Sequence, residues 1–282
     1  MKFKRFIFSL AMVLQLPVSA QDATNYLNLG VDNENAGNLD GALTNFNKAI
    51  EIKPDFAPAY YNRGVLEQAK GDLNDELADY NKAIEIKPDF FEAYRNRGTL
   101  KFSEGDSGGA LIDLNKAIEI KPDDAIAYYN RGLAKSKNDS EGALADLAKA
   151  LELEPNFPNA SAAYYAMGNI RGMKGDSDGS LKDYNKAIDL NSASFQPNYY
   201  LAYYNRSIVR GKKGDLDGAL IDVNKTIELK PNYAPAYNVR GLIKETKNDL
   251  NGALEDLNKA IELVPDNPEA QMNLSELKKK MN

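Results

Sequence analysis

The sequence predicts an all-α protein built as a solenoid of seven similar helix pairs. Its main support is a tyrosine that recurs at intervals of 34, 34, 34, 36, 39 and 34 residues. The recurring residues are Tyr26, Tyr60, Tyr94, Tyr128, Tyr164, Tyr203 and Tyr237. A fixed period of this length is typical of proteins whose small units each bury their apolar faces against their neighbours.

Two motifs alternate along the chain and give each unit two short stretches of helical period. The first reads AYYNRG at 59–64 and again at 127–132, and the second reads DYNKAIEIKPDF at 79–90. Between them, Gly followed by Asp marks the end of one helix and the start of the next, because Gly accepts the left-handed conformation and Asp caps free amide groups. The expected caps are Asn38, Asp72, Asp106, Asp139, Asp176, Asp215 and Asp249.

These motifs resemble the tetratricopeptide repeat family over residues 23–267. Small residues stand eighth in each unit, as at Gly64 and Gly98, and a proline such as Pro88 closes most units. The resemblance implies a right-handed α-α superhelical solenoid that ends in a capping helix at 268–282. The expected repeats are 23–56, 57–90, 91–124, 125–157, 161–194, 200–233 and 234–267. The loop-like stretch 191–198 is expected to form a bend or a protruding loop.

The first twenty residues are expected to be a secretory signal peptide. Lys2, Lys4 and Arg5 precede an apolar run that is too short to span a bilayer, and the segment ends in Val18-Ser19-Ala20. Cleavage after Ala20 leaves no stable membrane anchor and lowers the formal net charge from −6 to −9. A retained anchor is the alternative.

Composition excludes several classes of function. The chain contains no His and no Cys, so Ser-His and Cys-His nucleophiles and ordinary zinc sites are excluded. The acidic balance of 41 Asp and Glu against 35 Lys and Arg argues against nucleic acid as a partner. We therefore expect no enzyme, no cofactor and no metal site. A calcium loop at 176–179 is not expected, since the later ligand spacing is missing.

The resemblance also implies a concave wall lined by the first helix of each unit. An asparagine stands at the sixth position of most units, where its amide could bind an extended peptide backbone of any sequence, and tyrosine often precedes it. The alternative is that this asparagine is simply a tolerated polar residue. The candidate peptide-binding residues are Asn28, Asn62, Asn96, Asn130, Asn205, Tyr61, Arg95, Tyr129, Tyr165 and Tyr204.

Other recurring residues are expected to be structural. The fourth-position tyrosines, such as Tyr60, should pack between helices. Arginine stands seventh in five units, and each of those units carries an Asp in its second helix, as in Arg63 and Asp79. The first unit has Leu29 and Asn45 instead, so both charges are lost together. This pattern predicts a partly buried Arg–Asp pair within each unit, or a pair with a neighbouring unit.

Together these features favour a non-enzymatic, exported scaffold that binds an extended segment of an unidentified protein in its groove. The alternative is a self-associating structural solenoid of the cell envelope, so a homo-oligomer is possible. Export could lead to the periplasm or to the medium.

Export predicts a definite mature N-terminus. Because Val18-Ser19-Ala20 fits a processing site, sequencing of the exported protein should begin at Gln21. Retention of Met1 in an envelope fraction would contradict this.

Overall fold

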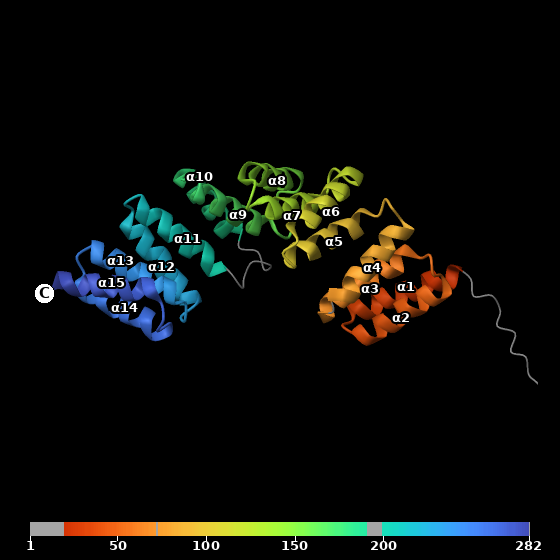
Figure 1. Cartoon of the computed structure of the whole chain (residues 1–282), viewed down its shortest axis with the longest axis horizontal. Coiled ribbons are helices and arrows are strands. Elements are labelled where there is room, and N and C mark those ends of the chain that lie inside the picture. The colour runs from red at the N-terminus through yellow and green to blue at the C-terminus, as the bar shows by residue number, and fades with distance from the viewer. Residues whose placement is uncertain (1–19, 72, 191–198, 282) are drawn as a thin grey trace, which may run out of the picture. The chain divides into compact units, whose positions relative to one another are not determined.

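A computed structural model describes residues 20–71, 73–190 and 199–281, and in these ranges the chain forms fifteen α-helices and no strand (Figure 1). The helices are α1 (Ala20–Asn35), α2 (Leu39–Ile52), α3 (Ala57–Lys70), α4 (Leu73–Ile86), α5 (Phe91–Ser103), α6 (Ser107–Ile120), α7 (Ala125–Lys135), α8 (Ser140–Leu153), α9 (Ala160–Met173), α10 (Ser177–Leu190), α11 (Tyr199–Lys212), α12 (Leu216–Leu229), α13 (Ala234–Thr246), α14 (Leu250–Leu263) and α15 (Pro268–Met281). The expected signal peptide, apart from Ala20, and the expected loop at 191–198 lie outside the described residues.

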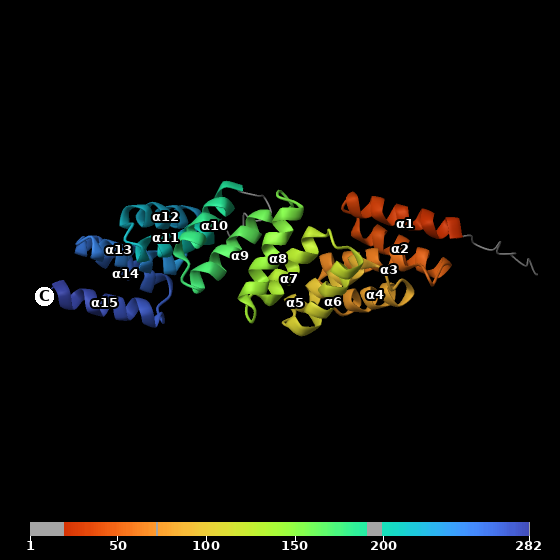
Figure 2. The ribbon, with the colours of Figure 1, turned by 90° about the horizontal axis from the view of Figure 1, so that it is seen from above.

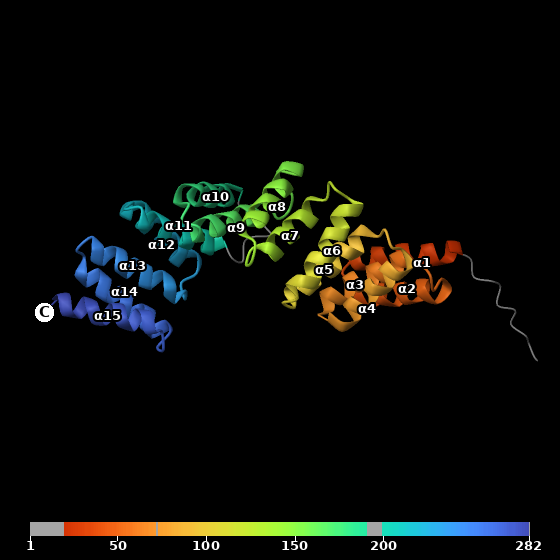
Figure 3. The ribbon, with the colours of Figure 1, turned by 45° about the horizontal axis from the view of Figure 1, so that its top comes forward.

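The helices fall into two compact units, residues 1–120 with α1–α6 and residues 121–282 with α7–α15. Within each unit, every odd-numbered helix except α15 packs most extensively against the even-numbered helix that follows it, and α15 packs on α14. Figures 2 and 3 show these helix pairs side by side. We call the first member of each pair helix A and the second helix B. The structure is therefore all-helical and built from successive pairs, as the sequence predicts.

Each pair is held at close range by the small residue at the eighth position of helix A. A Cβ added to Gly98 would come within 2.9 Å of Leu114, and one added to Gly64 would come within 2.9 Å of the Tyr80 ring. No larger side chain fits there without displacing the helix B residue. The small residue and the bulky residue therefore set the distance between the two helices.

The turns between helices A and B confirm the predicted caps wherever the structure describes them. The cap side chain accepts a hydrogen bond from the amide of a glycine three residues later, as Asp139 does from Gly142 at 2.8 Å. The same bond occurs at Asn38, Asp106, Asp176, Asp215 and Asp249. Where a glycine precedes the cap, it adopts the left-handed conformation, as at Gly105 with φ of 89°. Asp72 lies outside the described residues.

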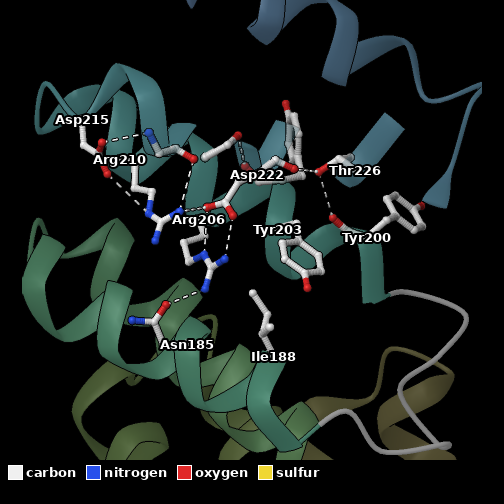
Figure 4. Close-up of polar contacts among 12 residues, drawn as sticks. Asn185, Ile188, Tyr200, Tyr203, Arg206, Arg210, Asp215, Asp222 and Thr226 are labelled. Atoms are coloured by element: carbon white, nitrogen blue, oxygen red, sulfur yellow. Dashed lines mark hydrogen bonds and ion pairs between the residues drawn. The ribbon is translucent and has the colours of Figure 1, made fainter. Parts of the chain in front are cut away.

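An Arg–Asp pair locks helix A to helix B and also reaches the preceding repeat. Arg206 donates two hydrogen bonds to the fully buried Asp222, at 2.8 Å from Nε and 2.6 Å from Nη2. Its Nη1 donates to Asn185 of the preceding helix B at 2.6 Å (Figure 4). The same three bonds occur at Arg63, Arg97 and Arg240. The predicted pair is therefore confirmed, and it serves both its own unit and the neighbour.

A second cation, at the eleventh position of helix A, also binds the buried Asp in several repeats. Lys101 lies 2.7 Å from Asp113, and Arg210 lies 2.9 Å from Asp222. The fifth repeat has Met167 in place of the seventh-position arginine, and there Arg171 alone of these two positions supplies the cation for Asp183. The sequence pattern considered above concerns the seventh-position arginine alone and does not include this second donor.

The fourth-position tyrosines pack less deeply than expected. They are half-buried, and in the five repeats with a seventh-position arginine its guanidinium covers the ring face, as with Arg206 over Tyr203 at 5.3 Å. The arginine therefore makes a cation–π contact with the tyrosine ring and helps to bury that ring. The core itself is filled by helix B residues such as Phe46, Tyr80 and Leu114.

The second repeat departs from the pattern with an acid inside its core. Glu76 stands where the other repeats have Ala or Ser, and its side chain is fully buried. In the described part of the chain, neither its carboxylate oxygens nor the Tyr80 hydroxyl has a hydrogen-bond partner. Burial raises the pKa of Glu76 to about 7, and the charge of Glu104 adds to this rise.

Because of Glu76, the free energy of unfolding should fall as the pH rises toward neutrality. Unfolded Glu76 ionises near 4.5, whereas folded Glu76 keeps its proton until about pH 7, so the stabilisation is complete below 4.5 and lost through pH 7. Glu76→Ala should be more stable than the parent by a margin that grows by roughly 2–3 kcal/mol between pH 5 and 8. Urea unfolding at several pH values measures this margin. A margin that does not change with pH would show that Glu76 does not titrate in this window.

Candidate functional site

The candidate site is the face of the A helices that the resemblance assigns to the concave wall. We call this face the A-helix wall and follow it through the second, fifth, sixth, ninth, twelfth and thirteenth positions of each repeat. In the unit of residues 1–120 the wall belongs to α1, α3 and α5, and in the other unit to α7, α9, α11, α13 and α15.

In the first unit the wall is polar, and part of its hydrogen bonding is internal. Asn96 donates to the Tyr61 hydroxyl at 3.2 Å and accepts from Arg95 Nε at 3.4 Å. Asn62 donates to the carbonyl of Pro58 at 2.7 Å, because the residue at the fifth position of the preceding repeat is Leu27, which has no hydroxyl. Asn28 is exposed.

In the second unit the sixth-position asparagines bind their neighbours in the same way. Asn205 donates to the Tyr165 hydroxyl at 3.1 Å and to Asn169 Oδ1 at 2.9 Å, and Asn169 also accepts from the Tyr184 hydroxyl at 2.7 Å. The rule extends into α15, where Asn273 donates to Asn238 at 2.9 Å. The amide N–H groups of Asn96, Asn205 and Asn273 therefore connect consecutive A helices.

Two other candidate residues of this unit differ in their surroundings. Tyr129 is buried, with 7% of its surface exposed, and packs edge-on against Phe157 at 5.6 Å between ring centroids. Tyr129 is one of the candidate peptide-binding residues, and the structure places its side chain in the core instead of on the wall. Burial also raises the pKa of Tyr129. Asn130 is half-buried.

Two adjoining hollows lie on the wall of the second unit. The first, of about 470 Å³, is bordered by α9, α10 and α11 and includes Asn169, Met173 and Asn205. The second, of about 440 Å³, is bordered by α11, α13, the start of α12 and the start of α15 and includes Tyr204, Val239 and Leu242. Ile208 and Lys212 line both hollows. Together they make an apolar floor along the fifth to seventh repeats, with Met173 77% exposed at its edge.

Two charged side chains take part in lining these hollows. Lys212 and Glu269 both line the second hollow. Burial, with Tyr233 and Glu269 adding to the effect, raises the pKa of Tyr204 to about 12, so its hydroxyl keeps its proton at neutral pH. Tyr204 also packs edge-on against Tyr233 at 5.1 Å. The site therefore offers apolar contacts, neutral hydroxyl and amide groups, and one charge of each sign.

Among the described residues, no group of three or more acidic side chains is arranged to hold a metal ion. None of the helices in that part of the chain combines the length and the apolar character needed to cross a bilayer.

Sequence reasoning missed the apolar residues of the hollows. Ile208, Leu242 and Val239 stand at wall positions and were available to the same positional rule that selected the asparagines. Their signal is the change from Asn to Val at the sixth position of the seventh repeat, together with bulky residues at the ninth. The two features occur together only in the seventh repeat, since the ninth position is Asn169 in the fifth repeat and Leu133 already stands there in the fourth.

Family models agree with this architecture. A model described as TPR repeat matches residues 35–71, 98–139 and 246–282, and one described as Tetratricopeptide repeat matches 57–90 and 161–194. These ranges together span more than half of the chain. No curated protein sequence gives a match.

Solved structures are similar over most of the chain. A tetratricopeptide repeat protein from Parabacteroides merdae is 23% identical, with 93% of this chain and all of that one covered at a TM-score of 0.60. The protein pilF of Pseudomonas aeruginosa is 17% identical, with 91% and 98% covered at 0.58. Both likenesses concern the fold alone.

A third structure is YrrB, described as a TPR protein with an unusual peptide-binding site. It is 27% identical, and the match covers 68% of this chain and 96% of that one at a TM-score of 0.58. The helix pairs, the glycine-mediated packing and these matches lead to one conclusion: the chain belongs to the tetratricopeptide repeat family.

Proposed function

We propose that this protein is an exported, non-enzymatic scaffold whose A-helix wall binds an extended segment of another protein. The single observation that carries the proposal is the pair of adjoining hollows on the wall of the fifth to seventh repeats. Pockets that combine an apolar lining with a few polar groups are typical of binding sites.

The chemistry of the hollows supports an extended segment with apolar side chains. Ile208 and Leu242 supply apolar contact, and Tyr204 adds a flat ring with a neutral hydroxyl. Lys212 and Glu269 offer the bound segment one positive and one negative charge, each of which can pair with an opposite charge on it. The fold is typical of protein–protein interaction scaffolds, and the similar protein YrrB is described as having a peptide-binding site.

The remaining candidate residues take a supporting role in this proposal. Asn96 and Asn205 hold the fifth-position tyrosines Tyr61 and Tyr165 in place through their hydrogen bonds. These tyrosines then present their rings from fixed positions, which lowers the entropy cost of binding. Export rests on the expected signal peptide alone.

Capture of the partner tests the proposal directly. The mature chain, residues 21–282, serves as bait for the envelope fraction, and the captured protein is identified and titrated. Ile208→Glu and Leu242→Glu each place a charge on the apolar floor and should weaken binding at least about 30-fold, since burying an unpaired charge costs several kcal/mol.

Matched controls separate the wall from the rest of the surface. Ile221→Glu changes a residue that is 68% exposed on α12 and should leave affinity unchanged. The triple change of Asn62, Asn96 and Asn130 to Ala tests a site on the first four repeats. Loss of binding in the triple variant, with full binding in Leu242→Glu, would place the site there instead. Failure to capture any protein would favour a self-associating solenoid.

A further inference from the structure

The last helix, α15, has the character of a helix A. Its residues Ala270, Asn273 and Leu277 are buried, and it contacts α14 and α13. Asn273 makes the sixth-position bond to Asn238 of the seventh repeat, as Asn205 of the sixth repeat does to Tyr165 of the fifth. One face of α15 therefore packs against the preceding repeat as helix A does in the other repeats.

The other face of α15 borders a hollow of about 470 Å³. Its lining residues are Ile261 of α14 and, from α15, Gln271, Leu274, Ser275, Lys278 and Lys279. The five α15 residues stand at the fourth, seventh, eighth, eleventh and twelfth positions of the repeat pattern. In complete repeats the seventh, eighth and eleventh positions are the ones that contact helix B.

The eighth position of helix A shows which side chain a helix B packs against it. Gly98, Gly132 and Gly241 each lie so close to a leucine of their helix B that an added Cβ would approach it to 2.8–3.0 Å. The sixth repeat has Ser207 at this position. Ser275 of α15 matches Ser207, so the hollow has room for a bulky apolar side chain above it.

The eleventh position adds a charge. Lys101, Lys135 and Lys244 bind the Asp that precedes this apolar residue, at 2.7, 2.7 and 2.8 Å. Lys278 stands at the same position in α15 and is exposed. Within residues 199–281 and the other described ranges, no acidic side chain forms an ion pair with it. The positive charge of Lys278 is therefore complementary to the Asp that a helix B presents at this place in complete repeats.

We propose that this face of α15 binds an amphipathic helix of a partner protein with the pattern Ala-x-x-Asp-Leu-x-x-Ala, which completes an eighth repeat in trans. The leucine covers Ser275, and the aspartate binds Lys278. The described B helices of this chain already pack on their own A helices, so the bound helix comes from another protein. This surface is separate from the A-helix wall and does not depend on the proposed function.

A peptide that carries the pattern can test the surface without the natural partner. The probe is a labelled peptide with the sequence of residues 249–264, which contains Ala253, Asp256, Leu257 and Ala260. A hydrocarbon link between positions 251 and 255, both exposed in the protein, keeps it helical. Fluorescence anisotropy with the full chain should show saturable binding.

Charge reversal gives the decisive comparison. Lys278→Glu should weaken binding about 10-fold or more, and a peptide with Asp256→Lys should restore binding to that variant. Ser275→Tyr should block the leucine position, and Lys230→Glu, an exposed lysine on another surface, should change nothing. Circular dichroism checks that each variant remains helical.

Three outcomes would overturn the proposal. They are no saturable binding up to about 1 mM peptide, equal binding by the parent and Lys278→Glu, and self-association of the chain that Lys278→Glu abolishes. The last result would assign the face to a second copy of this chain rather than to a partner's helix.

Discussion

The buried aspartate of helix B is the constraint on which the rest of the stack depends. A carboxylate inside a helix pair is costly unless charged donors surround it, and in most repeats the seventh-position arginine meets this need with two parallel hydrogen bonds. Because the guanidinium has a further donor, the same arginine also binds an asparagine of the preceding repeat. Closing one repeat therefore fixes the position of the one before it.

The junction of the fourth and fifth repeats shows what replaces this interaction. Here the arginine becomes Met167 and the asparagine of the preceding repeat becomes Ala148, so both partners are lost together. An apolar cluster that includes Tyr129, Phe157 and Met167 fills the junction. Asp183 is neutralised by Arg171 from the eleventh position. Apolar packing carries no directional preference, so this junction relies on shape where the others rely on hydrogen-bond geometry.

The structural features that recur from one repeat to the next could be predicted from the sequence alone. The period, the helix caps and the Arg–Asp pairs could be predicted, because each depends on residues that recur together. In the first repeat both partners of the Arg–Asp pair are replaced, by Leu29 and Asn45. The bonds of the wall asparagines could not, because each depends on which residue the neighbouring repeat presents: Asn96 meets a tyrosine hydroxyl, whereas Asn62 meets Leu27 and turns to a backbone carbonyl. The hollows were missed because their size depends on how side chains of different repeats fill a shared space.

The most direct test of the inter-repeat bond is a double-mutant cycle on Arg240 and Asn224, whose side chains lie 2.8 Å apart across two repeats. Free energies of unfolding are measured for the parent, Arg240→Leu, Asn224→Ala and the double variant. The account predicts a favourable coupling of about 0.5–1.5 kcal/mol, the range for one hydrogen bond to a partly exposed donor. Strictly additive effects would show that the arginine stabilises its own repeat alone and that apolar contacts set the stack.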